Sequence, residues 1–539
     1  MRLLFFFNTS MQYRSILSFA ARICLQIFKG VVFLSIILII TCTSIIYVEN
    51  VLRGLHSGLS GDASIFMTVG RGILNDLTPY QDLFETKPPG IFLIYALSLH
   101  WFDGIGLLRL IMLIICACSP LLFIWLSLQS IPKQSSKRRL FFGLIAFCFA
   151  IIINLRIMPE WDRFQLLANF LLFLYTMLLV SVNNYWTRVI IGAVILFVIS
   201  LLREPLILLY IGISILMIPS LRGCMIQVVY SSFFALCLWF VFMLTTGYLW
   251  PYFHIYLPNI LITRGDGILS LLTGSLRIWN FLYELKNFSL LFSLAFILLC
   301  LSLVSKLLIE QKNNCIRVQC LLRLLLMLYI TTLAIQFGEK NGGLYFENSI
   351  PAFTAIIALW LQLVGATSTH IRLVWHVRWT GFFAIIAAIL VPPTIFAPPL
   401  ASSKGYQWQV AEAGQLDRIL DRCDEDRYFY WGTMQPIIGL ARHSPLGPLF
   451  FQEKLFLDDQ FLAASILPNV QLANIILVDT DHKKPTSTVS QEVETELSEN
   501  FTLTPWLCAG EDFINPQGYQ LFFRKRMCSA PPNAHSCTL

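Results

Sequence analysis

One stretch of the chain, residues 58–110, combines acidic and basic side chains with glycine and proline. Asp62 comes first, Glu85 and Lys87 follow, and an arginine comes after an apolar run. A carboxylate within hydrogen-bond reach of a hydroxyl group can take its proton, and lysine or arginine offsets the charge of a phosphate. The stretch therefore contains the side-chain types needed to move a group from a phosphate to a hydroxyl.

Three other short segments combine charged and aromatic side chains. They contain Glu160, Trp161 and Asp162; Arg203 and Glu204; and Tyr345 and Phe346. An ionisable group at a membrane face is energetically costly, so each of these groups is a candidate for function. Clustered acids are just as often a solvated rim. Interfacial aromatic residues, including Trp250 and Tyr252, more often anchor a protein than contact a sugar.

The composition indicates which kind of molecule must position these residues. Of 539 residues, 57% are hydrophobic and 13% are charged, and the mean hydropathy is +0.70. Soluble domains carry about 25% charged residues. Residues 1–398 hold 27 Lys and Arg against 14 Asp and Glu, whereas residues 399–539 hold 11 against 17. We therefore expect a membrane domain followed by a soluble acidic domain, and we exclude a soluble enzyme, a disordered chain and a nucleic-acid binder.

The membrane domain contains eleven apolar segments, and a spanning helix needs roughly 20 such residues. The segments are 30–49, 105–130, 140–156, 164–182, 189–202, 205–219, 224–246, 288–305, 318–336, 349–366 and 380–397. The short pair around Arg203 is interpreted as a hairpin with its tip on the outer side. The predicted fold class is thus an α-helical polytopic membrane protein of about eleven spans.

The charges also give the chain a direction. Basic residues precede the first span, which places the N-terminus inside and favours an uncleaved anchor. The inner loops are then the basic ones, and of the 14 acids before residue 399 only Glu310 lies inside. Residues 90–101 are apolar but too short to cross, so they predict a re-entrant or surface helix within a large outer loop, residues 50–104. The C-terminal domain then emerges outside.

The C-terminal domain follows a proline-rich linker and has a different pattern. Apolar positions between residues 408 and 420 predict a helix, and residues 428–432, 473–479 and 519–524 predict buried strands. We expect a small α/β domain. The domain contains four cysteines, Cys423, Cys508, Cys528 and Cys537. They can form disulfides in an oxidising compartment or remain free thiols.

The stretch that carries the candidate chemistry resembles a known enzyme family. The pattern is Asp62, Gly72-Ile73-Leu74, Pro79-Tyr80, Glu85, Lys87-Pro88-Pro89-Gly90, an apolar half-helix at 91–101 and Arg109. It is similar to bacterial protein O-mannosyltransferase-like and aminoarabinose-transferase-like enzymes, which are GT-C fold glycosyltransferases that use polyprenyl-phosphate sugars. The later segments resemble the family more loosely, and Leu344 stands where the family has histidine.

The resemblance implies a role for each candidate residue. Asp62 is the general base, and the donor phosphate binds Lys87, Arg109 and Arg203. Glu85, Glu160 or Asp162 is expected to orient the acceptor, the base or a metal. The loop motif is Tyr80, Pro88, Pro89 and Gly90, and the sugar contacts are Tyr345 and Phe346. A divalent metal is possible in such a site, but the sequence contains no spacing typical of metal ligands that would support it.

These features predict a multi-pass enzyme of the cell membrane whose site and C-terminal domain are extracytoplasmic. It is expected to transfer a sugar, with inversion, from a polyprenyl-phosphate-linked donor to a lipid, glycan or protein hydroxyl. A lipid-linked glycan ligase or polymerase and a flippase-type transporter are the alternatives. A transporter predicts mid-span charges and an internal repeat. The charges here lie at helix ends, and no repeat is evident.

Overall fold

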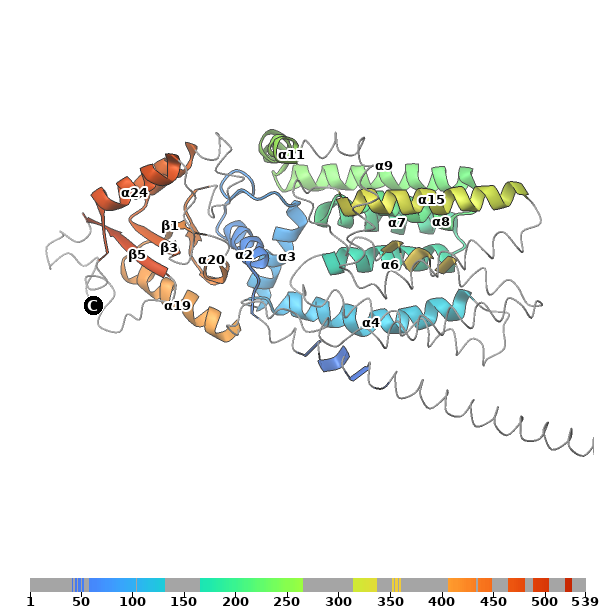
Figure 1. Cartoon of the computed structure of the whole chain (residues 1–539), viewed down its shortest axis with the longest axis horizontal. Helices are drawn as coiled ribbons and strands as arrows, with labels where there is room; N and C mark the ends of the chain where they lie inside the picture. Colours follow the sequence, from blue (N-terminus) through green and yellow to red (C-terminus); the bar gives the residue numbers. More distant parts are fainter. Residues whose placement is uncertain are drawn as a thin grey trace, which may run out of the picture.

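The structure is a computed structural model. It describes residues 58–102, 104–130, 165–264, 314–336, 406–432, 435–447, 464–479, 488–503 and 519–525, with isolated residues in 41–52 and 351–359. A helical bundle lies at one end and a mixed α/β region at the other (Figure 1). The short helices α2 and α3 lie between them.

Three helices of the described bundle are long and apolar enough to cross a membrane. They are α4 (Gly106–Ser130), α7 (Tyr185–Leu202) and α9 (Leu221–Thr245). Packed beside them are α6 (Gln165–Ser181), α8 (Leu206–Met217) and α15 (Asn314–Gln336). The chain is therefore a mostly helical membrane protein.

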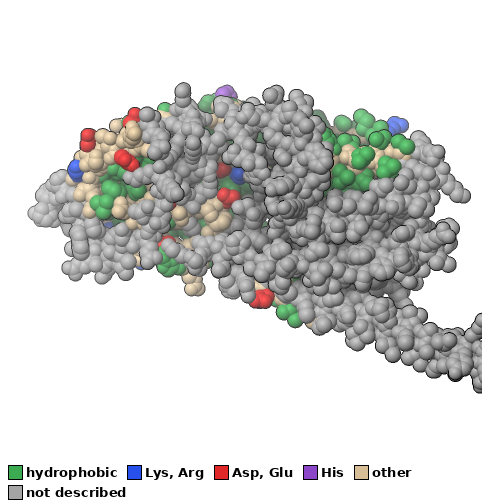
Figure 2. All heavy atoms as spheres, in the orientation of Figure 1, with side chains coloured by type: hydrophobic (Ala, Val, Ile, Leu, Met, Phe, Trp, Pro, Cys, Tyr) green, Lys and Arg blue, Asp and Glu red, His purple; other side chains and the backbone are tan. Residues whose placement is uncertain are grey.

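The outer surface of the bundle supports this conclusion. Phe233, Leu236 and Val241 of α9 and Leu322 and Leu325 of α15 are all exposed. Figure 2 shows hydrophobic side chains gathered over the bundle end of the molecule. A contiguous apolar surface of this kind marks a contact with lipid or with another protein. On helices of spanning length, lipid is the expected neighbour.

Six of the predicted apolar segments coincide with described helices. They are 105–130, 164–182, 189–202, 205–219, 224–246 and 318–336. The remaining five lie wholly or mostly outside the described residues, and these are 30–49, 140–156, 288–305, 349–366 and 380–397. The count of eleven spans and the direction of the chain stay predictions.

Helices α2 (Gly61–Leu74) and α3 (Pro89–Phe102) pack against each other between the two larger parts. A proline at the first position suits α3, because no helical hydrogen bond is lost there. Fourteen residues form a helix about 21 Å long, short of the roughly 30 Å hydrocarbon core. This length fits the short helix predicted at residues 90–101. Its side of the membrane stays a prediction.

The mixed α/β region contains a five-stranded sheet in the order β2-β1-β3-β5-β4. β1 (Arg427–Trp431) pairs in parallel with β2 (Ser444–Pro445) and β3 (Ile475–Asp479). β5 (Tyr519–Arg524) runs antiparallel to β3 and to β4 (Phe501–Thr502). The helices of this region are α19 (Tyr406–Arg422), α20 (Pro436–Leu440), α23 (Ile466–Leu472) and α24 (Thr488–Asn500).

The strands form where continuous apolar runs occur. Residues 428–431 and 475–477 are completely buried, as in strands covered on both faces. Each predicted strand segment overlaps one of the longer strands, whereas β2 and β4 have two residues each and leave no pattern in the sequence. Cys423 is buried, and the other three C-terminal cysteines lie outside the described residues, so the pairing is not tested.

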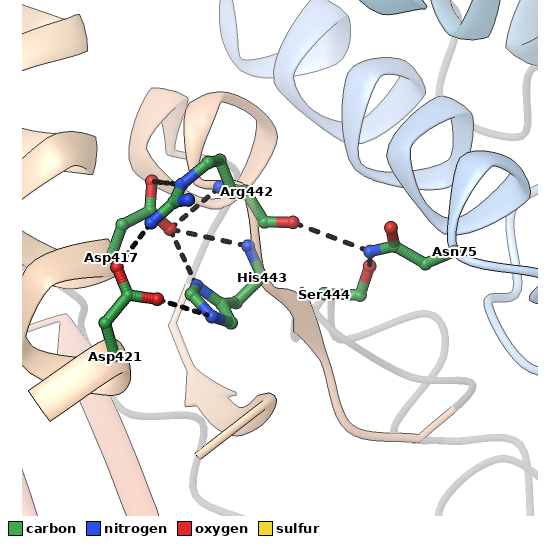
Figure 3. A network of polar contacts seen from close by, with 6 residues as sticks. All are labelled: Asn75, Asp417, Asp421, Arg442, His443 and Ser444. Atoms are coloured by element: carbon green, nitrogen blue, oxygen red, sulfur yellow. Dashed lines mark hydrogen bonds and ion pairs between the residues drawn. The ribbon is translucent and has the colours of Figure 1, made fainter. Parts of the chain in front are cut away.

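The α/β region contacts both ends of helix α2. Near the start of α2, a Cβ added to Gly439 of α20 would come within 2.5 Å of the Ser64 carbonyl oxygen. At the other end, Asn75 Nδ2 donates a hydrogen bond to Ser444 Oγ at 3.0 Å (Figure 3). Just before α2, Gln409 Oε1 accepts from the Leu59 amide at 2.7 Å. The position of α2 therefore depends on the C-terminal part of the chain.

A polar network holds the contact surface in the α/β region together (Figure 3). His443 Nδ1 lies 3.0 Å from Asp417 Oδ1, and the Arg442 amide donates to the same oxygen at 2.8 Å. The Arg442 guanidinium also pairs with Asp421 at 2.5 Å. The network fastens the segment before β2 to α19, so Ser444 meets Asn75 from a fixed support.

Candidate functional site

Asp62 lies in the first turn of α2 and is partly exposed. The helix begins at Ser60, whose side chain accepts a hydrogen bond from the Ala63 amide at 3.3 Å. The unpaired amides at a helix N-terminus favour a nearby negative charge. The charge of Asp62 is one of the causes that raise the pKa of Glu85, so the two acids lie near each other.

Glu85 is the buried acid of this site, with 5% of its surface exposed. Burial raises the pKa of Glu85, the Lys87 ammonium opposes this rise, and the nearby Asp62 carboxylate adds to it. Thr86 Oγ1 donates a hydrogen bond to Glu85 Oε1 at 3.2 Å. The site therefore holds a buried carboxyl group with a raised pKa near a more exposed acid and the Lys87 ammonium group.

The loop motif carries Lys87 to the end of the bundle. Pro88 and Pro89 are buried, and the Lys87 side chain is partly exposed. Gly90 follows, and an added Cβ there would lie 2.7 Å from both Cβ and the carbonyl oxygen of Leu201. Only glycine allows this close approach between α3 and the end of α7. The motif is thereby held beside the turn that contains Arg203.

The α7–α8 turn consists of Arg203, Glu204 and Pro205. It carries one predicted cation, Arg203, which is half-buried at the C-terminal end of α7. Its neighbour Glu204 accepts a hydrogen bond of 2.5 Å from the Tyr256 hydroxyl. The structure thus brings the first loop and the predicted hairpin tip together at one end of the bundle.

Arg109 lies in the first turn of α4, with its guanidinium over the ring of Tyr406 at 4.3 Å from the centroid. Tyr406 begins α19, so this contact joins the bundle to the α/β region. One face of the guanidinium is therefore occupied by an aromatic ring. The predicted role of Arg109 in binding a phosphate stays a prediction.

Sequence reasoning named Glu204 only as a charged neighbour of Arg203, and it missed Tyr256 and the contact between Tyr256 and Glu204. The signal for Glu204 was its place beside Arg203 in an otherwise apolar run. Tyr256 lies in η2 (Tyr252–Tyr256), a π-helical turn between α10 (Leu249–Pro251) and α11 (Leu257–Arg264). Such turns often occur at functional sites. Burial and then Glu204 raise the pKa of Tyr256, so its hydroxyl keeps the proton that it donates.

The remaining candidates differ in what the structure says of them. Trp250 is exposed, as expected for an anchor, whereas Tyr252 packs on Tyr80 and Tyr256. Four predicted site residues lie outside the described residues, and they are Glu160, Asp162, Tyr345 and Phe346. Figure 2 shows acidic and basic side chains next to one another between the α/β region and the bundle.

The residues that could hold a metal are carboxylates. Within the described ranges, no three His, Cys, Asp or Glu side chains are grouped as metal ligands. Asp62 and Glu85 are two neighbouring acids, and a third ligand from the described part of the chain does not join them. A divalent ion therefore has no complete ligand set among these residues, and its presence stays an open prediction.

No protein-family model and no curated protein matches this sequence. Two solved structures of an oligosaccharyltransferase from Archaeoglobus fulgidus align with the chain. One, a complex with Zn and sulfate, has 11% identity and a TM-score of 0.44 and covers 81% of this chain and 68% of that chain. The other, AglB with an inhibitory peptide and a dolichol-phosphate, has 12% identity and a TM-score of 0.43 and covers 91% and 75%.

Proposed function

We propose that the chain is a GT-C type membrane glycosyltransferase that moves a sugar from a polyprenyl-phosphate-linked donor to an acceptor hydroxyl on the outer face of the membrane. The observation that carries the proposal is the joining of two segments. Gly90 packs on Leu201, so Asp62, Glu85 and Lys87 share one end of an apolar bundle with Arg203. A base, cations and an apolar surface are what this reaction needs.

In the proposed reaction, Asp62 is the general base. The acceptor oxygen forms a bond to the anomeric carbon, its proton passes to the Asp62 carboxylate, and the bond from that carbon to the phosphate oxygen breaks. A single displacement of this kind inverts the anomeric carbon. Asp62 is partly exposed in the first turn of α2, which supports a side chain that an acceptor can reach.

The leaving group is a polyprenyl phosphate, and its charge must be met by cations. Lys87 and Arg203 are proposed to bind it, because the contact between α3 and α7 holds their segments together. Arg109 is proposed to bind at the edge of the site, with one face on Tyr406. The polyprenyl tail would lie on the apolar surface of the bundle.

The remaining proposed roles, orientation of the acceptor or the base and contact with the sugar, belong to acidic and aromatic residues. Glu85 is proposed to orient the acceptor or the base, since it is buried beside both Lys87 and Asp62. The same role is proposed for Glu160 or Asp162, and sugar contact for Tyr345 and Phe346. The acceptor is a lipid, a glycan or a protein hydroxyl.

The test is transfer of radiolabelled sugar by the purified full-length protein. A panel of defined polyprenyl-phosphate sugars is offered with lipid, glycan and peptide acceptors, with and without a chelator. Transfer from a polyprenyl-phosphate sugar supports the proposal. If the chelator leaves the activity unchanged, the reaction does not need a divalent metal. Absence of transfer from every donor contradicts the proposal and favours a lipid-linked glycan ligase, polymerase or flippase.

A further inference from the structure

Tyr80 has an unusual backbone for a tyrosine, with φ at 71°. A residue other than glycine adopts this left-handed backbone region at an energetic cost. Such residues persist where the surrounding structure holds them in place. The Tyr80 amide donates to the Leu83 carbonyl at 2.8 Å, which closes the loop around it. Its hydroxyl donates to the Lys87 carbonyl, also at 2.8 Å. Tyr80 therefore fixes the backbone of the residue that carries the candidate ammonium group.

The ring of Tyr80 meets a second tyrosine that belongs to another part of the chain. The centroids of the Tyr80 and Tyr256 rings are 4.7 Å apart. Both side chains are only 1% exposed. The hydroxyl of Tyr256 donates to Glu204, as described above. A continuous set of contacts thus runs from the α7–α8 turn through two rings to the Lys87 carbonyl.

This path is independent of the backbone contact between Gly90 and Leu201. The first loop and the α7–α8 turn are consequently joined at two points, one on each side of Lys87. Two attachments fix both the separation and the angle of two segments, whereas one attachment would act as a hinge.

We infer that Glu204, Tyr256 and Tyr80 form a positioning unit, the tyrosine bridge, which holds Lys87 at a set position relative to Arg203 for binding the donor phosphate. The inference rests on the proposed function for its ligand. Tyr80 reaches the Lys87 carbonyl and Tyr256 reaches Glu204, so the residues of the tyrosine bridge are inferred to act through Lys87. Loss of one hydroxyl should weaken donor binding and leave the chemical step largely intact.

The kinetic test uses single-atom changes. Tyr80→Phe and Tyr256→Phe should each raise the donor KM by roughly fivefold or more and change kcat by less than about twofold. Glu204→Gln keeps an oxygen acceptor for Tyr256 and should resemble the wild type, whereas Glu204→Leu should resemble Tyr256→Phe. A tenfold loss of kcat in Glu204→Gln would overturn a positioning role.

The matched control is Tyr175→Phe. The Tyr175 hydroxyl is also buried and lies 2.6 Å from Ser214 Oγ, but it joins α6 to α8 inside the bundle. Its loss should leave the donor KM unchanged. An equal rise of the donor KM in Tyr175→Phe would mean that any lost buried hydroxyl has this effect, and the tyrosine bridge would be refuted.

A second readout needs no substrate. Acylation of the Lys87 amine by a small water-soluble ester is followed by mass spectrometry in the ligand-free protein. The Tyr80→Phe and Tyr256→Phe proteins should be labelled at a rate several-fold different from wild type, with Tyr175→Phe unchanged. Altered labelling without transfer from any polyprenyl donor would support the tyrosine bridge and refute the proposed function. Unaltered labelling in both variants would refute the tyrosine bridge.

Discussion

At the scale of single residues, Glu85 shows how the fold changes the chemistry of a side chain. Its carboxyl group is buried, and this loss of solvent outweighs the favourable charge of Lys87. Folding therefore raises the pKa of Glu85 above its ordinary value. A neighbouring acid with more solvent, Asp62, is the one of the two that an acceptor hydroxyl can reach, and the base is therefore proposed there.

The raised pKa of Glu85 predicts a pH effect on stability. Between its ordinary value of 4.5 and the raised value, the folded protein binds more protons than the unfolded chain, so stability falls as pH rises. Glu85→Gln has no proton to lose and should lack this fall. Thermal unfolding in detergent from pH 4.5 upward should show wild type losing stability relative to the variant. Parallel curves would contradict the burial of a titrating carboxyl.

The sequence could identify some site residues and not others. Asp62 and Lys87 belong to a local pattern of acids, prolines and glycines that is visible in the chain. Glu204 and Tyr256 meet across 52 positions in the chain, and their contact exists only once α7 and the π-helical turn have packed. A pair of this kind leaves no local pattern.

At the scale of elements, the crossing of α3 and α7 decides whether the site forms. The distance between these helices is set by Gly90, where the Leu201 backbone fills the space of a side chain. The sequence predicted both helices from their apolar runs. It could not predict their contact, because a glycine after two prolines is equally suited to a turn.

Gly90→Ala should therefore be destabilising. Its Cβ would lie 2.7 Å from the Leu201 carbonyl oxygen, and overpacking of this kind costs about 1–3 kcal/mol. The control is Gly414→Ala in α19, where nothing lies within 4 Å of the added Cβ. That change should stabilise by about 0.5–1 kcal/mol, as alanine does in a helix. Unfolding in detergent measures both, and equal effects would contradict the close approach.

At the scale of the whole molecule, the α/β region is part of the proposed site's support. It holds α2 through Gly439 and through the hydrogen bond from Asn75 to Ser444. Its three longer strands were predictable from buried runs. The contact between the α/β region and α2 was not predictable from the sequence, because Gly439 meets Ser64 only in the folded chain. The membrane direction remains a prediction from charge, and the spans outside the described residues remain predictions from their apolar runs.

Gly439→Leu should therefore reduce transfer although it lies far from Asp62 in the chain. The added side chain would push α20 off the Ser64 backbone and tilt α2, and small misplacement of a catalytic group lowers rates on the order of 10-fold or more. Leu472→Ser, at a position 69% exposed on α23, should have no effect. Initial rates compare the two. Full activity of Gly439→Leu would show that α2 does not depend on this contact.

The central claim is that Asp62 deprotonates an acceptor in sugar transfer from a polyprenyl phosphate. The direct measurement is transfer of radiolabelled sugar by purified wild type and Asp62→Asn, which keeps the size and removes the base. Loss of a general base lowers the rate by about 10²–10⁴-fold, and the amount of folded protein should be unchanged. Transfer by the wild type with this loss in the variant is the predicted result. Near-normal transfer by Asp62→Asn would contradict the account.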